Sequence, residues 1–282
     1  MTSPLISITI PFYEDINCIA TIKSLKNQTL DNFICFINDD FSGEKYYRAI
    51  NSAIDGDQRF QYYRQPKNHG GWKNCATCIN IHKYVANTKY SFEMGHHDVI
   101  SENYLLECVS FLEDNPEYIA CTGKMLSFVE NIEEATARIG AEYEFFDQTG
   151  FEAFVNSVAT LADCTVYNAV FRTNILHELN ELPFLNTPMV RFDHLVISLR
   201  SSLGKHKVLE NVQYFRRVFV EDKRENFVNR QSKDVNIVQL TTNFLLGYIK
   251  LYEELYHKKI PSNEFLEARG LIFDCLLKRF AS

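Results

Sequence analysis

The chain has 282 residues, of which 46% are hydrophobic and 13% aromatic, and its formal net charge is −7 at pH 7. The hydrophobic share is ordinary for a globular protein with a core, and the length fits one large domain or one domain with a helical appendage. The negative charge argues against a general nucleic-acid binder.

Cysteine usage and the apolar runs predict a cytoplasmic protein. Most of the eight cysteines lie inside apolar runs, as buried thiols of a reducing compartment do. Cys75 and Cys78 have CxxC spacing without a second pair, so adjacent turns of one helix explain them as well as zinc does. The N-terminus lacks the basic flank and apolar run of a signal peptide. No stretch approaches the ~20 apolar residues of a membrane span.

The first hundred residues alternate between strand and helix patterns. Strands are predicted at residues 5–10, 33–37, 60–63 and from 90, and helices at residues 15–27, 44–54 and 72–86. The segment 33–37 is apolar on both faces, as in a parallel strand covered by helices. The order predicts an α/β fold with a doubly wound, mostly parallel sheet.

Polar clusters follow the predicted strands. They are Tyr13-Glu14-Asp15, Asn38-Asp39-Asp40 and His96-His97-Asp98. Ligands of open α/β sheets bind beyond the carboxyl ends of the strands, so three clusters there favour a site over three separate turns. Imidazole and carboxylate both bind divalent cations, although a hydrogen-bonded turn explains the last cluster alone. Ser101 is the expected N-cap of the next helix.

Beyond Pro116 the pattern changes. Strands are predicted at 118–122, 124–129 and 164–171, and helices at 151–162, 173–180, 191–203 and, split at Pro261, from 235 onward. The last helix has a broad apolar face with Lys278 and Arg279 near its end. It is expected to pack on its own domain, or to dock on a partner subunit as a homodimer contact, or on a membrane surface.

Five short motifs occur in the order seen in one enzyme family. They are the strand Ser7 to Tyr13, the helix ending Ser24-Leu25-Lys26-Asn27-Gln28-Thr29, the strand Phe33 to Ser42, the turn Asn68-His69-Gly70-Gly71 and the strand from Tyr90. Together they resemble glycosyltransferase family 2, the inverting GT-A group. The resemblance is strong over residues 5–125 and weaker to about 220. It implies a GT-A domain at 1–220, with a nucleotide-sugar half at 1–115 and an acceptor half at 116–220, and a helical extension at 221–282.

The resemblance implies a nucleotide-sugar donor and several donor-site residues. Pro11, Phe12, Tyr13 and Glu14 would line the nucleoside pocket. Asp40 would accept a hydrogen bond from the base, which favours a UDP- or dTDP-sugar, and Asp39 would shape that turn. Asn68 and Gly70 would form the neighbouring turn. Lys73 is either a point charge that neutralises the diphosphate or a solvated surface lysine.

The sequence departs from the family at the metal motif. Relatives carry Asp-x-Asp or Asp-Asp where this chain has Gly95-His96-His97-Asp98. Asp98 is the predicted metal ligand, with His97 as a second ligand or phosphate donor. Mn²⁺ tolerates imidazole better than Mg²⁺ does, so Mn²⁺ is favoured over Mg²⁺. The alternative is a metal-independent enzyme in which His96 and His97 balance the diphosphate charge.

The catalytic base is expected in the second half, facing the acceptor. Arg191-Phe192-Asp193-His194-Leu195 resembles the family's acidic motif ahead of the acceptor helix, although its spacing to Arg200 is slightly off. Asp193 is the predicted base and Asp163 the reserve. A helix cap or turn carboxylate is the plain alternative for each.

The function that the resemblance implies is inverting sugar transfer to a hydroxyl of a saccharide or lipid-linked acceptor in surface polysaccharide synthesis. The expected location is the cytoplasm or the inner face of the membrane. A dehydrogenase or nucleotidyltransferase would need glycines after the first strand, where this chain has Pro11 to Asp15. The remaining rival is a GT-A protein that binds nucleotide-sugar or glycan without turnover.

Overall fold

The computed structural model describes residues 3–137, 148–160, 167–175, 192–219 and 236–280. The chain divides into two compact units. The sheet unit comprises residues 1–139, 168–177 and 206–218, and the helical unit comprises residues 140–167, 178–205 and 219–282. The bounds of these compact units differ from those of the two functional halves predicted from the sequence. The functional halves stay a prediction.

The sheet unit begins with four parallel strands in the order β3-β2-β1-β4. Their bounds are β1 (Ile6–Phe12), β2 (Phe33–Asp39), β3 (Phe60–Arg64) and β4 (Tyr90–Glu93). β1 is buried almost along its length and lies between β2 and β4. The predicted α/β class and the alternation of strands and helices are therefore confirmed.

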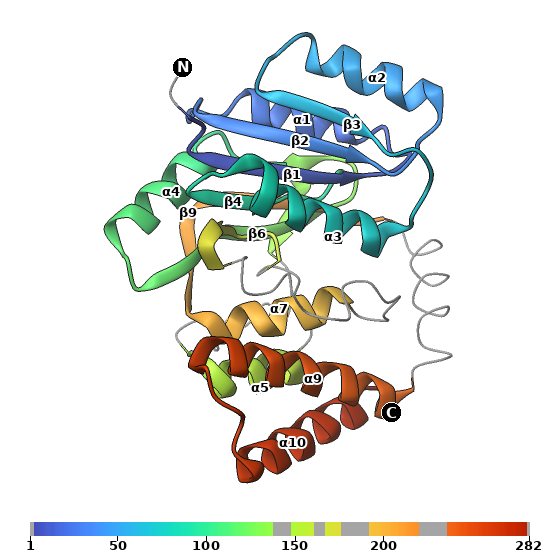
Figure 1. Cartoon of the computed structure of the whole chain (residues 1–282). Coiled ribbons are helices and arrows are strands. Elements are labelled where there is room, and N and C mark those ends of the chain that lie inside the picture. Colours follow the sequence, from blue (N-terminus) through green and yellow to red (C-terminus); the bar gives the residue numbers. More distant parts are fainter. Residues whose placement is uncertain (1–2, 138–147, 161–166, 176–191, 220–235, 281–282) are drawn as a thin grey trace. The chain divides into compact units, whose positions relative to one another are not determined.

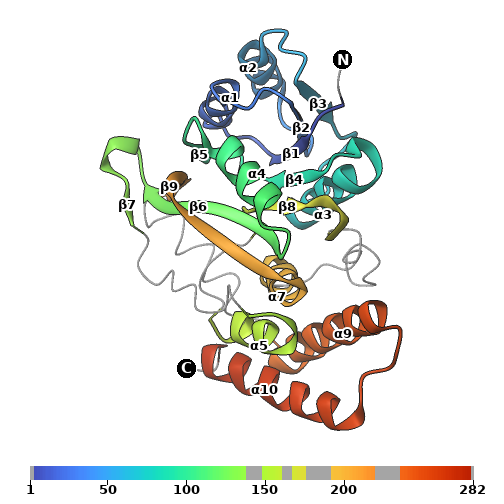
Figure 2. The same cartoon turned by 90° about the vertical axis from the view of Figure 1, so that its left-hand side faces the viewer.

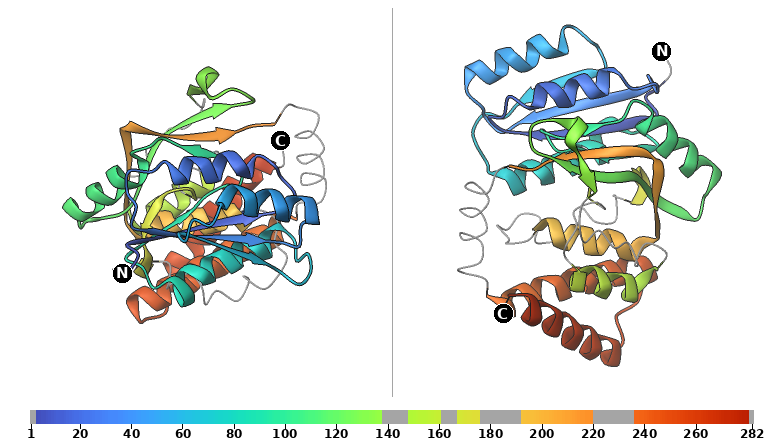
Figure 3. Two further views of the ribbon diagram at one scale, coloured as in Figure 1. Left: turned by 90° about the horizontal axis from the view of Figure 1, so that it is seen from above. Right: turned by 180° about the vertical axis from the view of Figure 1, so that it is seen from behind.

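Helices cover both faces of these strands. The helices of this part are α1 (Cys18–Lys26), α2 (Glu44–Ile54), α3 (Gly71–Ile81), which continues as the π-helix η1 (His82–Ala86), and α4 (Tyr104–Asp114). α1 and α3 lie on opposite faces of the β1–β2 pair (Figure 1, and from behind in Figure 3). The sequence predicted one helix at 72–86, whereas the last turn is wider, around the buried His82.

The other part of the sheet is antiparallel and was predicted less well. It adds β5 (Val99–Ile100), β6 (Tyr118–Phe128), β7 (Thr136–Ala137), β8 (Val170–Arg172) and β9 (Lys205–Arg217), with the 3-10 turn η2 (Ile132–Glu134) before β7. Figure 2 shows β6 and β9 as neighbouring long strands. The sequence predicted a break at Gly123 and no strand at β9. A Cβ at Gly123 would lie 2.6 Å from the Val212 carbonyl oxygen, so this glycine permits close strand approach and is not a break.

The helical unit contains α5 (Gly150–Thr160), α7 (Phe192–Leu203), α9 (Ile237–Tyr256) and α10 (Ser262–Phe280). The predicted helices at 151–162 and 191–203, and the split at Pro261, are confirmed. The helices share a core that includes Phe154, Leu199, Phe244 and Ile272. One face of α10 therefore packs on its own unit, the first of the three roles predicted for it.

Three further predictions have structural outcomes. Ser101 does not cap α4, because its hydroxyl accepts from Gln213 N in β9 (3.0 Å) and the cap position is Asn103. All seven cysteines that the structure describes are free thiols. Among the helices described, none combines the length and apolar character needed to cross a membrane.

Candidate functional site

Three strands of the sheet unit end at one edge, and each is followed by a polar cluster. Phe12 at the end of β1 pairs with Asp39 at the end of β2, and Thr9 pairs with Glu93 at the end of β4. Backbone bonds continue past the strands, from Asp40 N to Phe12 O (2.9 Å) and from Met94 N to Thr9 O (2.9 Å). The three clusters that the sequence placed at strand ends therefore share one edge.

Asp39 is fully buried, and hydrogen bonds satisfy both of its oxygens. Oδ1 accepts from the Ser42 amide (2.9 Å) and hydroxyl (2.5 Å), and Oδ2 accepts from the Tyr62 hydroxyl. Arg64 Nε lies 3.7 Å from Oδ2. Burial and this hydrogen bond raise the pKa of Tyr62, so the phenol stays a donor at neutral pH. Asp39 thus holds the turn after β2, and its part in a donor site stays a prediction.

Asp40 joins the turn after β2 to the predicted Asn68–Gly71 turn. Its Oδ1 accepts from His69 N (2.7 Å) and its Oδ2 from Gly70 N (2.8 Å). Asn68 Oδ1 also accepts from Gly70 N (3.0 Å), and Gly70 has a φ of 89°, which favours glycine. A carboxylate has about four lone-pair sites, so Asp40 retains acceptor capacity beyond these two bonds.

A buried amide network, which sequence reasoning missed, holds the start of α3 against the strand ends. Asn74 Nδ2 donates to Phe12 O (3.3 Å) and Asn38 O (3.1 Å), and its Oδ1 accepts from Asn38 Nδ2 (2.5 Å) and Gln65 Nε2 (3.1 Å). Asn74 follows the predicted Lys73 directly. Lys73 is exposed in the first turn of α3, with its Nζ 5.3 Å from the centre of the Trp72 ring.

The loop after β1 exposes Tyr13 and Glu14, two of the four residues predicted to line the nucleoside pocket, and buries a third, Phe12. Phe12 is fully buried, whereas Tyr13 is 46% exposed. Glu14 has a φ of 44°, and its Oε1 accepts from Gly43 N (3.2 Å) while Ser42 Oγ accepts from Glu14 N (3.0 Å). Glu14 therefore ties the loop after β1 to the loop after β2. Phe12 supports that edge from within the core.

A cluster of two histidines and one carboxylate lies at the same edge. Asp15 Oδ2 is 3.7 Å from His96 Nε2 and 3.5 Å from His97 Nδ1, and the two imidazole centres are 4.6 Å apart. Asp15 Oδ1 accepts from the amide (2.9 Å) and side chain (2.8 Å) of Asn17, which aims Oδ2 at the imidazoles. The pairing of β1 with β4 makes neighbours of residues 81 positions apart (96 − 15).

The local hydrogen bonds determine the protonation of the cluster. His96 Nδ1 lies 3.0 Å from Pro11 O, and because a carbonyl only accepts, Nδ1 carries the proton and Nε2 a lone pair. Burial and the neighbouring His97 lower the pKa of His96 to about 4. The pKa of Asp15 falls to about 2, because hydrogen bonds from His97 and Asn17 outweigh the opposing effect of burial. At neutral pH the Asp15 carboxylate therefore faces the neutral imidazole of His96.

Asp98, the predicted metal ligand, has another set of partners. Its Oδ2 accepts from Tyr214 OH (2.6 Å) and its Oδ1 from Arg217 N (3.0 Å), both on β9. Its Oδ1 lies 3.8 Å from His97 Nε2. A Cβ at Gly95 would lie 2.3 Å from Asp98 Oδ2, so a carboxylate side chain does not fit at position 95 with Asp98 in this place.

The residues present fit a divalent metal ion. One ligand atom each from Asp15, His96 and His97 lie within 4.8 Å of one another, among the residues that the structure describes. His96 Nδ1 donates to Pro11 O, and a metal-binding histidine is typically oriented by such a hydrogen bond from its other ring nitrogen. His97, a predicted ligand, belongs to this group, whose carboxylate is Asp15; Asp98 lies outside it, and its role as a ligand stays a prediction. A carboxylate with two imidazoles suits Mn²⁺-like or Zn²⁺-like ions better than Mg²⁺.

The predicted bases lie largely beyond what the structure describes. Asp193 is the second residue of α7, so its backbone begins a helix as predicted, and its side chain lies outside the described residues. Asp163 falls in the segment 161–166, also outside them. Both roles stay predictions.

A sheet whose parallel strands end in polar loops, extended by antiparallel strands, defines a GT-A-like fold. Two solved structures of S. aureus TarS share it. TarS 1–349 with UDP-GlcNAc matches with a TM-score of 0.62 and 14% identity over 97% of this chain and 72% of that one. TarS 1–349 alone matches with a TM-score of 0.56 and 16% identity over 98% and 92%. At these identities the likeness concerns the fold alone.

Sequence comparison gives the family. The profile described as glycosyl transferase family 2 matches residues 7–179, more than half of the chain. The chain therefore belongs to glycosyl transferase family 2, as its motifs predicted. An uncharacterized glycosyltransferase of Haemophilus influenzae (strain ATCC 51907 / DSM 11121 / KW20 / Rd) is 32% identical over 117 residues, 41% of this chain and 45% of that protein. The chain thus matches less than half the length of this curated relative.

Proposed function

We propose that the chain transfers a sugar from a uridine or thymidine diphosphate donor to an acceptor hydroxyl, with inversion at the anomeric carbon. The observation that carries the proposal is the single edge at which Asp40, Asp15, His96 and His97 meet, in a chain of glycosyl transferase family 2. Residues 1–115 then bind the donor, and residues 116–220 face the acceptor. S. aureus TarS, of similar fold, has been solved with UDP-GlcNAc, which supports a uridine donor.

In this proposal Asp40 recognises the nucleobase of the donor. Its carboxylate is held by two backbone amides and retains acceptor capacity for the N3 hydrogen of a pyrimidine-dione. A site built to pair with one donor rejects bases that lack it. Tyr13, exposed beside Asp40's turn on the neighbouring loop, is suited to stack on the base.

The diphosphate is expected at the Asp15–His96–His97 cluster. Mn²⁺ bound there would stabilise the negative charge that builds on the leaving nucleoside diphosphate. Asp15 supplies the carboxylate, and Pro11 O holds His96 with its Nε2 lone pair available at neutral pH. Asp98 is held by Tyr214 and Arg217 of β9 and adds a second carboxylate charge 3.8 Å from His97 Nε2. Lys73 contributes a mobile positive charge at the start of α3.

The acceptor hydroxyl must lose its proton as its oxygen attacks the anomeric carbon from the side opposite the leaving group. We propose that the carboxylate of Asp193 accepts this proton. Asp163 is the next candidate if substitution of Asp193 leaves turnover unchanged. General-base assistance is typically worth ~100- to 10,000-fold in rate. Asp193→Asn should therefore lower turnover by that order and leave nucleotide affinity nearly unchanged. Wild-type turnover in this variant would exclude Asp193 as the base.

Calorimetric titration with Mn²⁺ and with UDP separately tests the donor site without requiring turnover. Asp15→Asn should weaken Mn²⁺ binding and leave metal-free UDP binding unchanged, and Asp40→Asn should do the reverse. Asp98→Asn is the matched control for the ligand assignment, because it removes a neighbouring carboxylate charge of the same size. If Asp98→Asn abolishes Mn²⁺ binding and Asp15→Asn does not, Asp98 is the ligand. Equal affinity for GDP and UDP would contradict the proposal that Asp40 recognises a pyrimidine nucleobase.

Two finer points rest on the family resemblance. The acceptor is a saccharide or a lipid-linked saccharide, and the pathway is surface polysaccharide synthesis at the cytoplasmic face of a membrane. The second candidate function, binding without turnover, is favoured by Gly95-His96-His97-Asp98 in place of the family's carboxylates. Release of UDP from UDP-sugars by the purified chain separates the two, since a pure binder releases none.

A further inference from the structure

α10 carries an apolar row along its groove with α9, and the core of the helical unit does not include this row. Leu266, Gly270, Phe273 and Leu277 follow one another at intervals of four, three and four residues. Leu266 is 56% exposed and Leu277 41% exposed, and Gly270 is exposed between them. These intervals are those of the d and a positions of a coiled coil. We call these four residues the α10 seam.

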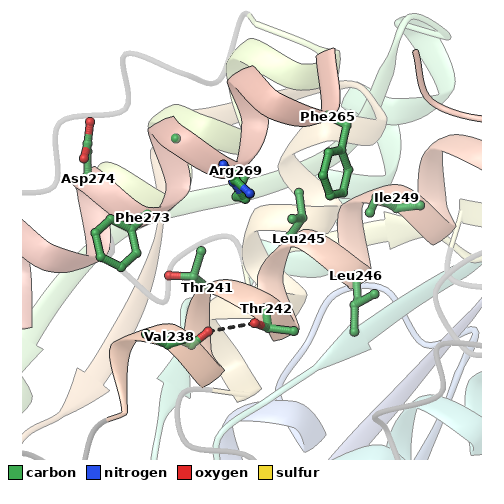
Figure 4. A pocket seen from close by; sticks show the side chains of 11 residues that line it. Val238, Thr241, Thr242, Leu245, Leu246, Ile249, Phe265, Arg269, Phe273 and Asp274 are labelled. Atoms are coloured by element: carbon green, nitrogen blue, oxygen red, sulfur yellow. Dashed lines mark hydrogen bonds between the residues drawn. The ribbon is translucent and has the colours of Figure 1, made fainter. Parts of the chain in front are cut away.

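A groove beside the seam widens this apolar surface. It encloses about 500 Å³ between α9 and α10, and Figure 4 shows Phe265 and Phe273 pointing from α10 toward α9. Its lining on α9 consists mainly of apolar side chains and threonines, namely Val238, Thr241, Thr242, Leu245, Leu246 and Ile249. A contiguous exposed apolar surface of this kind is typical of an interaction site.

Two charged residues beside the seam, Arg269 and Asp274, are spaced so that they can pair with the same residues of a second copy of α10. With Gly270 as an a position, Arg269 is a g position and Asp274 the e position five residues later. Both side chains line the groove from its α10 side. In a parallel pair of identical helices, each g residue meets the following e residue of the other helix. Arg269 would therefore face Asp274 of a second copy, twice across a two-fold axis.

The same charges disfavour the opposite orientation. In an antiparallel pair, e positions face e positions, which would place Glu267 next to Asp274 of the other helix. Like charges at such positions destabilise the pair. Gly270 leaves room for the close approach of a second helix, because a Cβ there would meet nothing within 4 Å. The Phe273 rings, one turn further along, fill the adjacent layer.

We infer that the α10 seam docks on the same seam of a second copy of this chain, with the two α10 helices parallel and Arg269 of each copy paired with Asp274 of the other. The inference is independent of the proposed sugar transfer, because it uses only residues of the helical unit. The two-fold axis makes the surface self-complementary, as an isologous interface requires.

Sedimentation velocity of the full chain across a dilution series tests the inference. Wild type should show a concentration-dependent monomer–dimer equilibrium. Arg269→Asp and Asp274→Arg each place like charges opposite one another and should weaken the dimer by on the order of tenfold. The double variant restores opposite charges and should return to near the wild-type dissociation constant. Lys259→Asp, an equal charge change at an exposed loop position, should leave the equilibrium unchanged.

Two outcomes overturn the inference. A wild-type chain that stays monomeric at every concentration contradicts it directly. A double variant that is no better than either single variant contradicts the parallel pairing. Flotation with vesicles of anionic phospholipid identifies the rival occupant. A monomer that binds the vesicles and loses binding on Leu266→Glu assigns the seam to a lipid surface instead.

Discussion

Two regions of this molecule reverse the usual distribution of side chains. At the edge where β1, β2 and β4 end, Asp39, Asp40 and Asp98 are almost completely buried. In the α10 seam, Leu266 and Leu277 are exposed. Burial of a carboxylate is unfavourable unless hydrogen bonds compensate it, and exposure of leucine forgoes the free energy that burial would contribute.

The difference between the regions lies in how each arrangement is compensated. Each buried carboxylate accepts hydrogen bonds at both oxygens, so the strand edge is complete within one chain. Nothing in the described part of the helical unit covers the α10 seam to the same degree, and we infer that a second molecule completes it. Substitutions in the first region should therefore change folding stability, whereas those in the second should change association.

The largest contrast is expected within α10. Ile272 is fully buried in the helical core and Leu266 is exposed. Ile272→Ala should lower the free energy of unfolding by about 2–5 kcal/mol because it leaves a cavity. Leu266→Ala should change it by less than about 0.5 kcal/mol. Urea unfolding at a concentration where the chain is monomeric measures both. A loss at Leu266 as large as that at Ile272 would mean that the seam belongs to the core.

A matched pair of glycines sharpens the comparison. Gly95→Ala should destabilise the fold by about 1–3 kcal/mol, because the added Cβ would lie 2.3 Å from Asp98 Oδ2. Gly270→Ala should stabilise the monomer by about 0.5–1 kcal/mol through helix propensity, since nothing lies near its Cβ. Thermal unfolding of both variants tests this. A neutral Gly95→Ala would show that Asp98 can move freely.

The strand edge should also respond to pH. The pKa of His96 in the folded chain is about 4, below the 6.5 of the free side chain, so the unfolded chain binds the proton more readily. This contribution to stability is complete above pH 6.5 and should be lost as the pH falls toward 4, by about 1–3 kcal/mol. Urea unfolding in EDTA measures it.

Asp15 extends the acid range of the same test. Its folded pKa of about 2 lies below the ordinary 3.8, so its contribution is present above pH 3.8 and is lost as the pH falls toward 2. His96→Asn keeps a donor for Pro11 O but does not titrate. In this variant the free energy of unfolding should fall less between pH 6.5 and 4, and its fall below pH 4 should be unchanged. An unchanged profile would assign the effect to another group.

The smallest expected effect concerns one hydrogen bond. Tyr62→Phe removes the phenol that donates to buried Asp39 and should cost about 1 kcal/mol. Tyr47 lies 5.5 Å from Tyr62, ring centre to ring centre, and is partly exposed. Tyr47→Phe is therefore the control and should change the free energy of unfolding by less than about 0.5 kcal/mol. Equal effects would mean that the Tyr62 bond to Asp39 contributes nothing measurable.

Local patterns were sufficient for the elements near the N-terminus. Strand and helix periodicity, which depends only on neighbouring residues, predicted β1 to β4 and α1 to α3 within a few residues. The family motifs also lie in this part, because they are contiguous turns. The helix starting at Phe192 and the split of α9 from α10 at Pro261 were likewise predicted from local signals.

Only the tertiary structure could decide contacts between distant residues. β9 was not predicted, yet it supplies the Tyr214 hydroxyl and the Arg217 amide that donate to Asp98. Its Gln213 amide donates to the Ser101 hydroxyl, which the sequence predicted as a helix cap. Asp15 joins His96 and His97 only because β1 pairs with β4. Sequence alone therefore determined the order of the elements as far as β4 and the loops there that carry polar groups. Which carboxylate faces the imidazoles depended on strand pairing, whose partners are set by long-range packing and leave little local signal.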